Sequence, residues 1–598
     1  MLVADYVFDF IANKGIGHVF IVTGGGAMYL NDALGRQKRI RYICNLHEQA
    51  CAMAAEGYAR VTNRPGVITV TTGPGGTNAI TGVLGAWLDS VPMVVLSGQV
   101  KRETMISRCP ELRLRQLGDQ EADIVTIVKS ITKYAVSVMD KENIRYHLEK
   151  AWHLATLGRP GPVWIDIPLD IQASEIGNPE ALRSFKPEPV SGLVDVERAA
   201  RRVYDLLLKA ERPVIVAGCG VRLADSVPLF RDLAHTLKVP VLTTISGIDL
   251  LPSDHPYFFG RSGMLGDRPA NFIMQNADLV LILGTRMSLR ILGYAYDTFA
   301  RAAYKVMVDI DPAELAKPTL KIDDPICADA GAFLTALAVQ ANEPWDEKEK
   351  WMGYCRRVKS KYPVVTDAHR ARTDYVSSYV LAEMISQALT GEEIVVTGNG
   401  IAYTSTFQAV KLKPNNRMFA NMACASMGYD LPAAIGAAFA GKGRTVICLA
   451  GDGSIQMNIQ EFQTLVNHAL PVKIFMLNND GYLSLKQTQS AFFNQHFVGS
   501  HPGSGVVLPD MMKVVAAYGV PVYRVSSHAE LANVLPEILK TPGPVFCEVM
   551  CDPFEVVAPK TESKRLPDGR MVSSPLEDLF PFLERDEFRT NMIVPPLS

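Results

Sequence analysis

The sequence lacks the features of a membrane or exported protein. No apolar run reaches the length needed to span a bilayer, and residues 1–12 have neither a basic n-region nor a small-residue cleavage site. The chain starts directly in a segment with the pattern of a folded helix, so we expect a cytoplasmic protein without a transit peptide. Low-complexity segments and sequence repeats are also missing, which argues against a repeat architecture.

Clustered metal ligands and basic patches are missing as well. The 10 cysteines and 11 histidines are scattered without the spacing of a zinc site. Cys547 and Cys551 are close in sequence, but on a strand-like run they need not meet, and we expect all ten cysteines to be reduced thiols. The net charge of −2, without any basic run, argues against a nucleic-acid partner.

What the chain does have is the length and composition of a multidomain globular protein. Its 598 residues are 48% hydrophobic and 20% charged, enough for about three or four domains. Short apolar runs alternate with helical patterns in three blocks, residues 1–175, 190–340 and 365–555. The pattern predicts an α/β fold of three domains, each with a mainly parallel, doubly wound sheet, and the first and third domains could share a fold.

Polar segments separate and follow these blocks. The proline-bearing residues 178–192 and 341–350 are predicted to join the domains. The polar, turn-rich residues 556–598 are expected to form a C-terminal tail that covers a site.

Residues 446–480 show the alternating pattern most clearly. The apolar run 446–450 predicts a buried strand, and 472–477 predicts a second strand after a proline. Between them, apolar residues recur at helical spacing, which predicts one amphipathic helix with a buried face: Ile455, Ile459, Phe462 and Val466. The segment is therefore a βαβ unit, whose ligand site lies beyond the carboxyl ends of its strands.

Asp452 and Asn479 stand at those two strand ends. Their oxygens suit Mg²⁺, which takes few protein ligands together with phosphate oxygens. Gly451 and Gly453 would let a bulky anion approach the backbone closely. The pair therefore favours a Mg²⁺–diphosphate anchor, although an aspartate helix cap and an asparagine turn would show the same residues without a ligand.

Gly-Asp-Gly followed one βαβ unit later by Asn-Asn resembles the diphosphate motif of thiamine diphosphate (ThDP) enzymes. In that family the acid, the second asparagine and a backbone carbonyl two residues later hold the metal, which implies Asp452, Asn479 and Gly481 here. The resemblance also places at the cofactor Gly400, Gly451, Gly453 and Ser454.

The segment NLHEQACAMAAEGYAR, residues 45–60, carries Glu48 at the start of a small-residue helix. An acid in the first turn commonly does no more than complement the helix dipole. The segment also resembles the family motif HEQ-x5-AEGYAR, whose glutamate contacts the pyrimidine ring of ThDP and favours the imino tautomer that deprotonates the thiazolium carbon. The resemblance therefore implies that Glu48 activates the cofactor.

Two other segments also match the cofactor site of this family. Residues 71–82 form a glycine turn feeding a helix, which could be any tight βα turn, but they match the family's pyrimidine-domain loop. The match implies cofactor contacts at Gly73, Gly76 and Asn78. Met427 falls where the family keeps a bulky apolar residue that bends the cofactor, although methionine is more often core filling.

Over nearly its whole length the chain resembles the acetolactate synthase large-subunit group of ThDP enzymes, in segments such as GYARVTNRPGV and GRPGPVWIDIP. The group implies a homodimer or homotetramer in which the first domain of one subunit faces the third domain of another. Glu48 and Asp452 would then meet across a dimer interface, and a monomer would be inactive.

The middle block resembles the FAD-binding domain of that group. A ligand-free or ADP-binding domain is the alternative, since several relatives have lost the flavin. The implied FAD contacts are Gly218, Gly220, Thr244, Gly263, Gly266, Arg286, Asp309, Asp311 and Asp329.

The chain departs from the group around the acceptor pocket and not around the cofactor. The group's phenylalanine before a glutamine, its lysine after "IP" and its tryptophan after the Asn-Asn loop are all replaced. Losing two rings and a cation would open the space that normally selects a second small keto acid. The implied substrate positions are Gly25, Asp119, Leu169, Gln487 and Thr488, and Gln120 is a candidate to orient the substrate.

The sequence thus predicts a ThDP- and Mg²⁺-dependent enzyme that decarboxylates pyruvate or a close 2-keto acid and transfers the two-carbon unit to an acceptor carbonyl. The acceptor could be a large carbonyl, such as the nucleotide-linked ketosugars used in branched-sugar pathways, or a second pyruvate, as in acetolactate synthase itself. Two other classes remain open: a flavin-using pyruvate oxidase of the same fold, and a non-catalytic nucleotide-binding scaffold.

Overall fold

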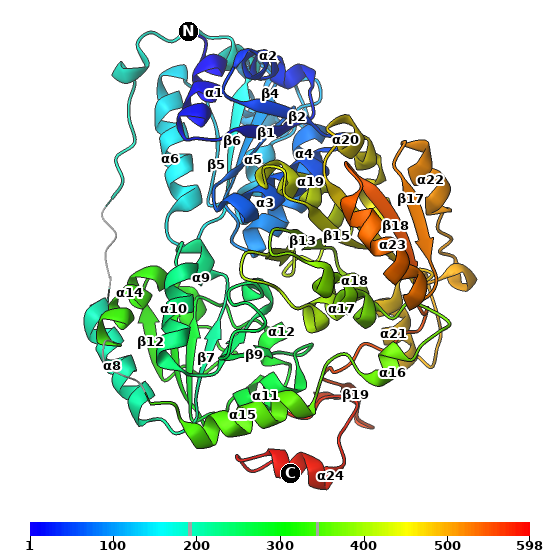
Figure 1. The fold of residues 1–598 in the computed structure, drawn as a ribbon. Helices are drawn as coiled ribbons and strands as arrows, with labels where there is room; N and C mark the ends of the chain where they lie inside the picture. Colours follow the sequence, from blue (N-terminus) through cyan, green and yellow to red (C-terminus); the bar gives the residue numbers. More distant parts are fainter. Residues whose placement is uncertain (189–193, 342–345, 598) are drawn as a thin grey trace.

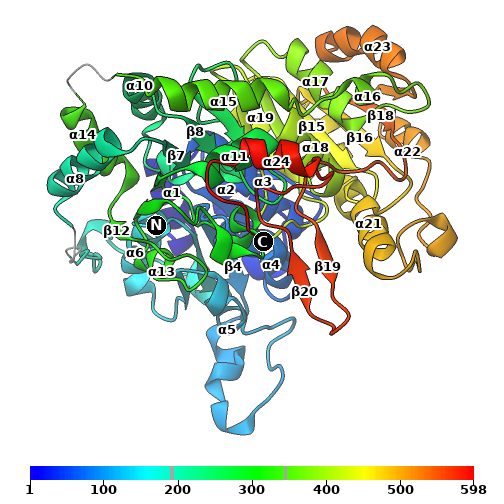
Figure 2. The ribbon, with the colours of Figure 1, turned by 90° about the horizontal axis from the view of Figure 1, so that it is seen from below.

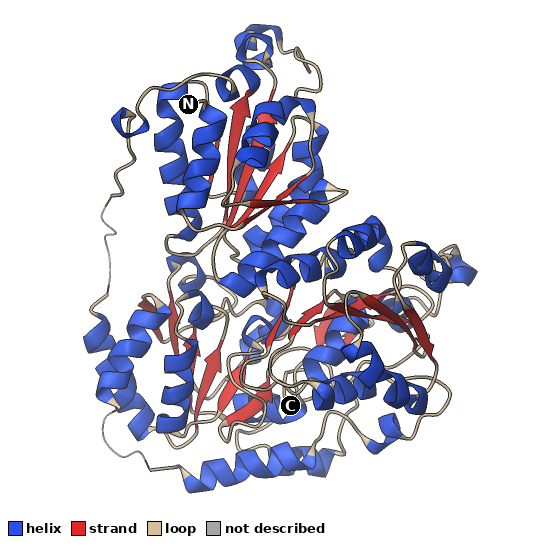
Figure 3. Ribbon diagram, turned by 45° about the horizontal axis from the view of Figure 1, so that its top comes forward, coloured by secondary structure: helices blue, strands red, loops and turns tan. Residues whose placement is uncertain are grey.

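The computed structural model describes residues 1–188, 194–341 and 346–597, and it shows three α/β domains (Figure 1). The predicted joins at 178–192 and 341–350 lie partly outside the described residues, as do the predicted start of the second domain at 190 and the last residue of the tail. Each domain has a six-stranded sheet flanked by helices (Figure 3). All neighbouring strands in these three sheets pair in parallel, so the predicted fold class is confirmed.

The first domain has the strand order β2-β1-β3-β4-β6-β5. Helices α3, α4 and α5 bury apolar side chains against one face of the sheet, and α1, α2 and α6 against the other. The elements are α1 Val3–Asn13, β1 His18–Ile21, α2 Met28–Arg36, β2 Arg41–Cys44, α3 Glu48–Thr62, β3 Gly66–Val70, α4 Pro74–Leu88, β4 Met93–Gln99, α5 Ile124–Val128, β5 Tyr134–Ser137, α6 Ile144–Thr156, β6 Pro162–Pro168 and α7 Leu169–Gln172.

The third domain repeats this topology. Its strand order is β14-β13-β15-β16-β18-β17, which is the order of the first domain when the strands of each domain are counted from one. The first and third domains therefore share a fold, as predicted. The elements are α16 Asp367–Arg370, α17 Ser378–Ala388, β13 Ile394–Thr397, α18 Gly400–Ala409, β14 Arg417–Ala420, α19 Asp430–Ala440, β15 Val446–Gly451, α20 Phe462–Asn467, β16 Val472–Asn478, α21 Leu483–Phe492, α22 Met511–Ala517, β17 Val522–Val525, α23 His528–Lys540 and β18 Val545–Met550.

The central domain has a different order, β12-β11-β10-β7-β8-β9. The connection reverses direction between β7 and β10, so a crevice is expected beyond the carboxyl ends of these two strands. The elements are α8 Val196–Lys209, β7 Pro213–Ala217, α9 Gly220–Leu223, α10 Val227–Leu237, β8 Val241–Thr243, β9 Phe258–Arg261, α11 Arg268–Asn276, β10 Leu279–Leu283, α12 Leu289–Leu292, β11 Tyr304–Asp309, α13 Pro312–Leu315, β12 Asp324–Cys327, α14 Ala330–Gln340 and α15 Glu349–Lys361.

The small-residue helix α3 packs closely along α19 of the third domain. A Cβ atom on Gly57 would lie 2.3 Å from the carbonyl oxygen of Ala433, and one on Gly436 would lie 1.8 Å from that of Ala54. Side chains of the first and third domains form one continuous apolar core around this contact. The alanines and glycines of α3 thus allow two domains to join, which fixes the start of α3 relative to the third domain.

The described part of the tail packs mainly on the central domain (Figure 2). Leu576 is buried in the core of that domain, and Glu577 forms an ion pair of 2.7 Å with Arg301. The hairpin of β19 Ser563–Arg565 and β20 Met571–Ser573 precedes this contact, and α24 Arg585–Asn591 follows it beside α15. That the tail also covers the cofactor site stays a prediction.

One predicted element is wrong. Residues 455–466 do not form a single amphipathic helix: a 3₁₀ segment, Ile455–Glu461, precedes the short helix α20, and Asn458 inside the 3₁₀ segment has non-helical angles that kink it. The buried Asn458 amide donates to the carbonyl oxygen of Gly428 at 2.8 Å. Apolar spacing could not show this, because a tertiary hydrogen bond outweighs the local preference for continuous helix.

Two further findings concern expectations from composition. All ten cysteines are free, in agreement with the expected reduced thiols. Within the described residues, no helix combines the length and the apolar character of a transmembrane span.

Candidate active site

The loops after β15 and β16 bring the three predicted metal ligands together. The carboxylate of Asp452, 3% exposed, accepts hydrogen bonds from the backbone nitrogens of Asn479 at 3.1 Å and Gly481 at 2.9 Å. Its other oxygen accepts from the Gly453 nitrogen at 2.7 Å. Burial raises the pKa of Asp452 to about 6, against the opposing effect of these hydrogen bonds. The strand ends therefore place a desolvated carboxylate directly against the Asn-Asn loop.

The same loop holds an unsatisfied oxygen. Oδ1 of Asn479 is buried and has no hydrogen-bond partner among the described residues, which is a costly arrangement unless a ligand satisfies it. Gly481 has a φ of +109°, and a Cβ atom there would lie 2.4 Å from the Ser500 carbonyl oxygen, so only glycine fits. A carboxylate, an amide oxygen and a backbone carbonyl form a set of hard oxygens that suits Mg²⁺.

In the described part of the chain, no three or more His, Cys, Asp or Glu side chains come together in an arrangement that could hold a metal ion. A metal at Asp452 would therefore depend on this mixed donor set and on oxygens from a phosphate-bearing ligand.

Glu48 is the first residue of α3 and is 8% exposed. His47 caps the helix by accepting a hydrogen bond from the Gln49 nitrogen at 3.0 Å, and the Asn78 amide donates to Glu48 Oε2 at 2.9 Å. A Cβ atom on Gly75 would lie 3.6 Å from Glu48 Oε1, so the first turn of α4 passes beside the carboxylate. The two predicted residues of the pyrimidine site thus meet in one place.

The glycine turn before α4 is also joined to the loop that carries Gln120. Gly73 has a φ of +60°, and a Cβ atom there would lie 2.1 Å from the Gln120 carbonyl oxygen. Thr72, next to Gly73, donates to Gln99 at the end of β4 at 2.7 Å. Gln120 itself has a φ of +61° and an exposed side chain. Its backbone is fixed against the predicted cofactor loop while its amide stays free to meet a ligand.

Four of the other residues predicted to contact the cofactor are Ser454, Met427, Gly400 and Gly76. Ser454 donates to the buried Asp430 at 2.7 Å and accepts from the Gly428 nitrogen at 3.0 Å, and Met427 beside it is half-buried. Gly400 begins α18 with a φ of +58°. Gly76 faces inward, because a Cβ atom there would lie 3.0 Å from the side chain of Ile124, so packing already explains this glycine.

The predicted acceptor positions differ in accessibility. Gly25, Asp119 and Thr488 are exposed, whereas Leu169 is half-buried at the start of α7. The amide of Gln487 donates to the carbonyl oxygen of Glu555 at 2.8 Å, so it holds the start of the tail.

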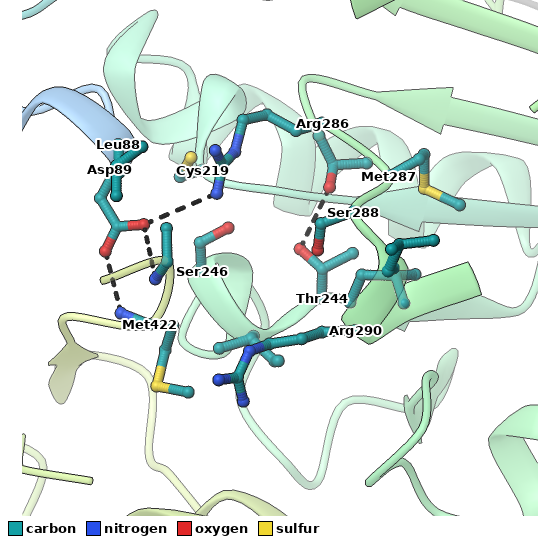
Figure 4. Close-up of a pocket in the computed structure, with 15 residues that line it drawn as sticks. Leu88, Asp89, Cys219, Thr244, Ser246, Arg286, Met287, Ser288, Arg290 and Met422 are labelled. Atoms are coloured by element: carbon teal, nitrogen blue, oxygen red, sulfur yellow. Dashed lines mark hydrogen bonds and ion pairs between the residues drawn. The ribbon is translucent and has the colours of Figure 1, made fainter. Parts of the chain in front are cut away.

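The crevice of the central sheet contains three adjoining cavities of about 340, 180 and 410 Å³. Arg286 lines all three, and Figure 4 shows its guanidinium turned toward Asp89, at 3.8 Å. The predicted nucleotide contacts that line these cavities are Gly220, Thr244, Arg286, Asp309, Asp311 and Asp329. Each of the larger cavities is of the size that small-molecule ligands occupy.

Several residues predicted for this crevice have structural partners of their own. Gly218 packs against Thr285, while Gly263 and Gly266 form a turn after β9 that packs on Arg290 and Arg261. Asp311 and Asp329 cap α13 and α14, so helix capping accounts for both without a ligand. Burial raises the pKa of Asp309 to about 6.

Comparisons with known proteins bear on this arrangement. Family models described as the N-terminal TPP binding, central and C-terminal TPP binding domains of thiamine pyrophosphate enzymes match residues 1–123, 200–337 and 398–549. The chain is 33% identical over 584 residues to "Probable acetolactate synthase 2, chloroplastic" of Oryza sativa subsp. japonica, covering 94% of this chain and 84% of the relative.

Two bacterial relatives are covered more fully. "Acetolactate synthase isozyme 2 large subunit" of Escherichia coli (strain K12) is 31% identical over 580 residues, 96% of this chain and 99% of the relative. "Acetolactate synthase isozyme 1 large subunit" of the same organism is 33% identical over 564 residues, 93% and 95%. The chain belongs to the acetolactate synthase-like ThDP enzymes. It is thus an enzyme of the carboligase and transferase type, and the predicted family is confirmed.

Within this ThDP enzyme, the structure reveals a residue that sequence reasoning missed. Lys486, 1% exposed on α21, donates from Nζ to the carbonyl oxygen of Asn479 at 2.8 Å and lies 3.4 Å from that of Asp480. Burial lowers the pKa of Lys486, while Asp452 and Asp480 oppose the shift. The only signal in the sequence was a lysine one turn into an otherwise ordinary helix, seven residues beyond Asn479.

A second missed cluster joins the cofactor helix to the central crevice. Arg60 of α3 forms ion pairs of 2.7 Å with Glu56 and with Asp89. Asp89 in turn accepts from the backbone nitrogens of Met422 at 3.0 Å and Ala423 at 3.3 Å (Figure 4). The cluster ties α3, the crevice and the segment leading to Met427 into one hydrogen-bonded unit.

Proposed function

We propose that this ThDP enzyme, with Mg²⁺, decarboxylates pyruvate or a close 2-keto acid and transfers the two-carbon unit to an acceptor carbonyl other than a second pyruvate. The observation that carries the cofactor part is the anchor at Asp452, where a buried carboxylate after β15 lies against the loop after β16 that holds the orphaned oxygen of Asn479. For pyruvate and an aldehyde RCHO the balance is CH₃COCOO⁻ + RCHO + H⁺ → CH₃COCH(OH)R + CO₂.

When bound, ThDP supplies the nucleophilic carbon and the electron sink that decarboxylation requires. Asp452, Asn479 and Gly481 would hold Mg²⁺ and, through it, the diphosphate. Lys486 fixes the carbonyl of Asn479, so the ligand loop is set before the cofactor arrives.

Glu48 would share a proton with the pyrimidine ring. Asn78 donates to one of its oxygens, which orients the carboxylate, and the low exposure of Glu48 keeps competing water away. Glu48 also stands at the amino end of α3, where an acidic side chain complements the helix dipole.

The acceptor part of the proposal depends on Asp119, Leu169 and Thr488. Asp119 and Thr488 are exposed polar residues, and none of the three offers a cation to a second carboxylate. A small anionic keto acid would therefore lose a charge partner, while a larger polar carbonyl compound would find room. A preference of this kind is worth about 1–3 kcal/mol per contact, so slow condensation of two pyruvate molecules would persist.

Acetolactate synthase itself is the second candidate, favoured by the names of the relatives. An assay in which pyruvate competes with another acceptor distinguishes these two candidate functions. With ThDP, Mg²⁺, labelled pyruvate and propanal in excess, we expect the mixed hydroxyketone to exceed acetolactate. If acetolactate dominates with propanal, with an aromatic aldehyde and with a large ketone, the chain is an acetolactate synthase and the acceptor proposal is wrong.

We further propose FAD in the central crevice, held by Gly220, Thr244, Arg286 and Asp309. Decarboxylation followed by addition to a carbonyl transfers no electrons overall, so the flavin would have no redox step in this reaction. Released flavin absorbance after denaturation tests for it, and flavin reduction during turnover would instead identify a pyruvate oxidase.

The proposed assembly is a homodimer or homotetramer in the cytoplasm, with Glu48 of one subunit facing Asp452 of another. Within one chain, Glu48 is hydrogen-bonded inside the first domain and Asp452 inside the third. Sedimentation at the concentrations of the activity assay tests this, because a fully active monomer would contradict it.

A further inference from the structure

Residues 101–121 connect β4 to α5 and project away from the rest of the chain (Figure 2). The start of this loop is tied to the predicted acceptor region. Arg102 forms an ion pair of 2.7 Å with Asp170, the neighbour of Leu169, and its backbone nitrogen donates to the same carboxylate at 3.0 Å.

The end of the loop is closed by Glu121. This carboxylate is 6% exposed and accepts hydrogen bonds from three backbone nitrogens: Ile106 at 2.6 Å, Leu117 at 3.0 Å and Gly118 at 3.0 Å. One buried side chain therefore fixes both limbs of the loop. The next residue toward the amino end, Gln120, contacts Gly73 of the cofactor turn, so the loop is positioned relative to the predicted pyrimidine site.

Between these anchors the loop presents three exposed arginines, Arg108, Arg113 and Arg115. Among the described residues, none of the three forms an ion pair, although Glu111 and Asp119 lie in the same loop. Arg113 has a φ of +49°, a left-handed conformation that costs a residue with a Cβ atom about 1 kcal/mol. Such local strain is a reason to look for function.

Arg113 also lines a cavity of about 530 Å³ under the loop, above the ends of β4 and β5. The two carboxylates that line this cavity already accept hydrogen bonds from the protein. Glu121 accepts the three backbone hydrogen bonds, and Asp123 accepts from the nitrogen and hydroxyl of Thr126 at 3.2 and 2.7 Å. Hydrogen bonding leaves both carboxylates charged, so the cavity also carries negative charge. Among the described residues, the positive charge without an ion-pair partner is that of Arg108, Arg113 and Arg115 at the exposed surface of the loop.

We propose that this arginine loop binds a phosphate group carried by the acceptor, so that the substrate class is a phosphorylated aldehyde or ketone. Arginine suits this role because its planar guanidinium donates two parallel hydrogen bonds to phosphate oxygens. The proposal rests on the proposed function, since it assumes an acceptor other than pyruvate. Glu121 acts as a positioning residue that presents the arginines.

The test compares two acceptors that differ only in the phosphate, glyceraldehyde and glyceraldehyde 3-phosphate, with pyruvate as donor. The wild-type enzyme is expected to show a higher kcat/KM for the phosphorylated acceptor. In Arg113→Gln and in the double variant with Arg115→Gln, the ratio of the two kcat/KM values is expected to fall about tenfold to a hundredfold, mainly through KM. Arg198→Gln, an exposed arginine on α8, is the matched control and should leave the ratio unchanged.

A Glu121→Gln variant separates positioning from charge. It keeps every arginine but offers an amide to three N–H donors, so the ratio should fall while the apparent affinity for ThDP stays the same. Equal kcat/KM values for both acceptors in the wild type, or an unchanged ratio in both arginine variants, would overturn the proposal. If neither acceptor reacts and acetolactate is the only product, the proposed function fails as well, which distinguishes the two failures.

Discussion

The substitution Asp452→Asn separates the stability of the empty site from its affinity for the cofactor. Two effects oppose each other in the free protein. Burial raises the pKa of Asp452 from 3.8 to about 6, so the ionised carboxylate costs roughly 3 kcal/mol at neutral pH, a cost that an amide does not have. An amide, however, has only one acceptor oxygen. It leaves unpaired either the N–H of Gly453 or the N–H groups of Asn479 and Gly481, which costs about 1–3 kcal/mol of stability.

These magnitudes predict a free energy of unfolding within roughly 2 kcal/mol of the wild type in the absence of ligand. The affinity for ThDP, in contrast, should differ strongly between the variant and the wild type. Loss of the only carboxylate among the ligands is expected to weaken Mg²⁺-dependent ThDP binding at least about a hundredfold. At a ThDP concentration of about 100 times the wild-type Kd, the wild type gains about 2.7 kcal/mol of stability and the variant about 0.4 kcal/mol.

Calorimetric titration with ThDP in the presence of Mg²⁺, together with denaturant unfolding with and without both ligands, measures these quantities. Asp480→Asn is the control, because its side chain is exposed and asparagine tolerates the φ of +59° found there. Unchanged affinity in Asp452→Asn would place the metal elsewhere and refute the reasoning. A similar loss in Asp480→Asn would indicate a general effect of the loop.

Three other substitutions test the cofactor site and the effect of a buried carboxyl group. Glu48→Gln should retain ThDP and lower pyruvate decarboxylation at least about a hundredfold, measured as CO₂ release; a near wild-type rate would leave Glu48 only a helix-dipole role. Asp166→Asn removes a carboxyl group whose pKa burial raises from 3.8 to about 6. Because the unfolded chain releases this proton at lower pH than the folded chain, wild-type stability should fall by roughly 3 kcal/mol relative to the variant between about pH 4 and pH 7; parallel denaturation curves would contradict this. Lys486→Met should raise the Kd of ThDP about tenfold or more, with exposed Lys513→Met as control, and an unchanged Kd would mean that Lys486 only packs.

The proximity of Asp452 and Asn479 could be predicted from sequence because it follows from sheet topology. Asp452 and Asn479 each follow a buried parallel strand, and neighbouring parallel strands end at the same edge. The same argument does not reach Lys486, whose contact with the Asn479 carbonyl depends on how α21 folds back over the loop. A lysine in a helix has no local signature for that.

Two features could not be predicted from the sequence, and the physical cause is the same for both. Ile455, Ile459 and Phe462 have helical spacing, but the hydrogen bond from Asn458 to Gly428 interrupts the helix. The role of Glu121 was likewise hidden, since its three donors come from residues up to 15 positions away. Long-range polar contacts decide both cases, and apolar periodicity carries no information about them.

The most direct test of the central claim is a crystal structure of the protein with ThDP and Mn²⁺, with anomalous scattering to locate the metal. We predict one Mn²⁺ ion within about 2.3 Å of a carboxylate oxygen of Asp452, Oδ1 of Asn479 and the carbonyl oxygen of Gly481, with diphosphate oxygens completing the shell. We also predict the pyrimidine ring against a Glu48 carboxylate from the other subunit. A metal bound to other residues, or ThDP bound without contact to Glu48, would contradict the central claim.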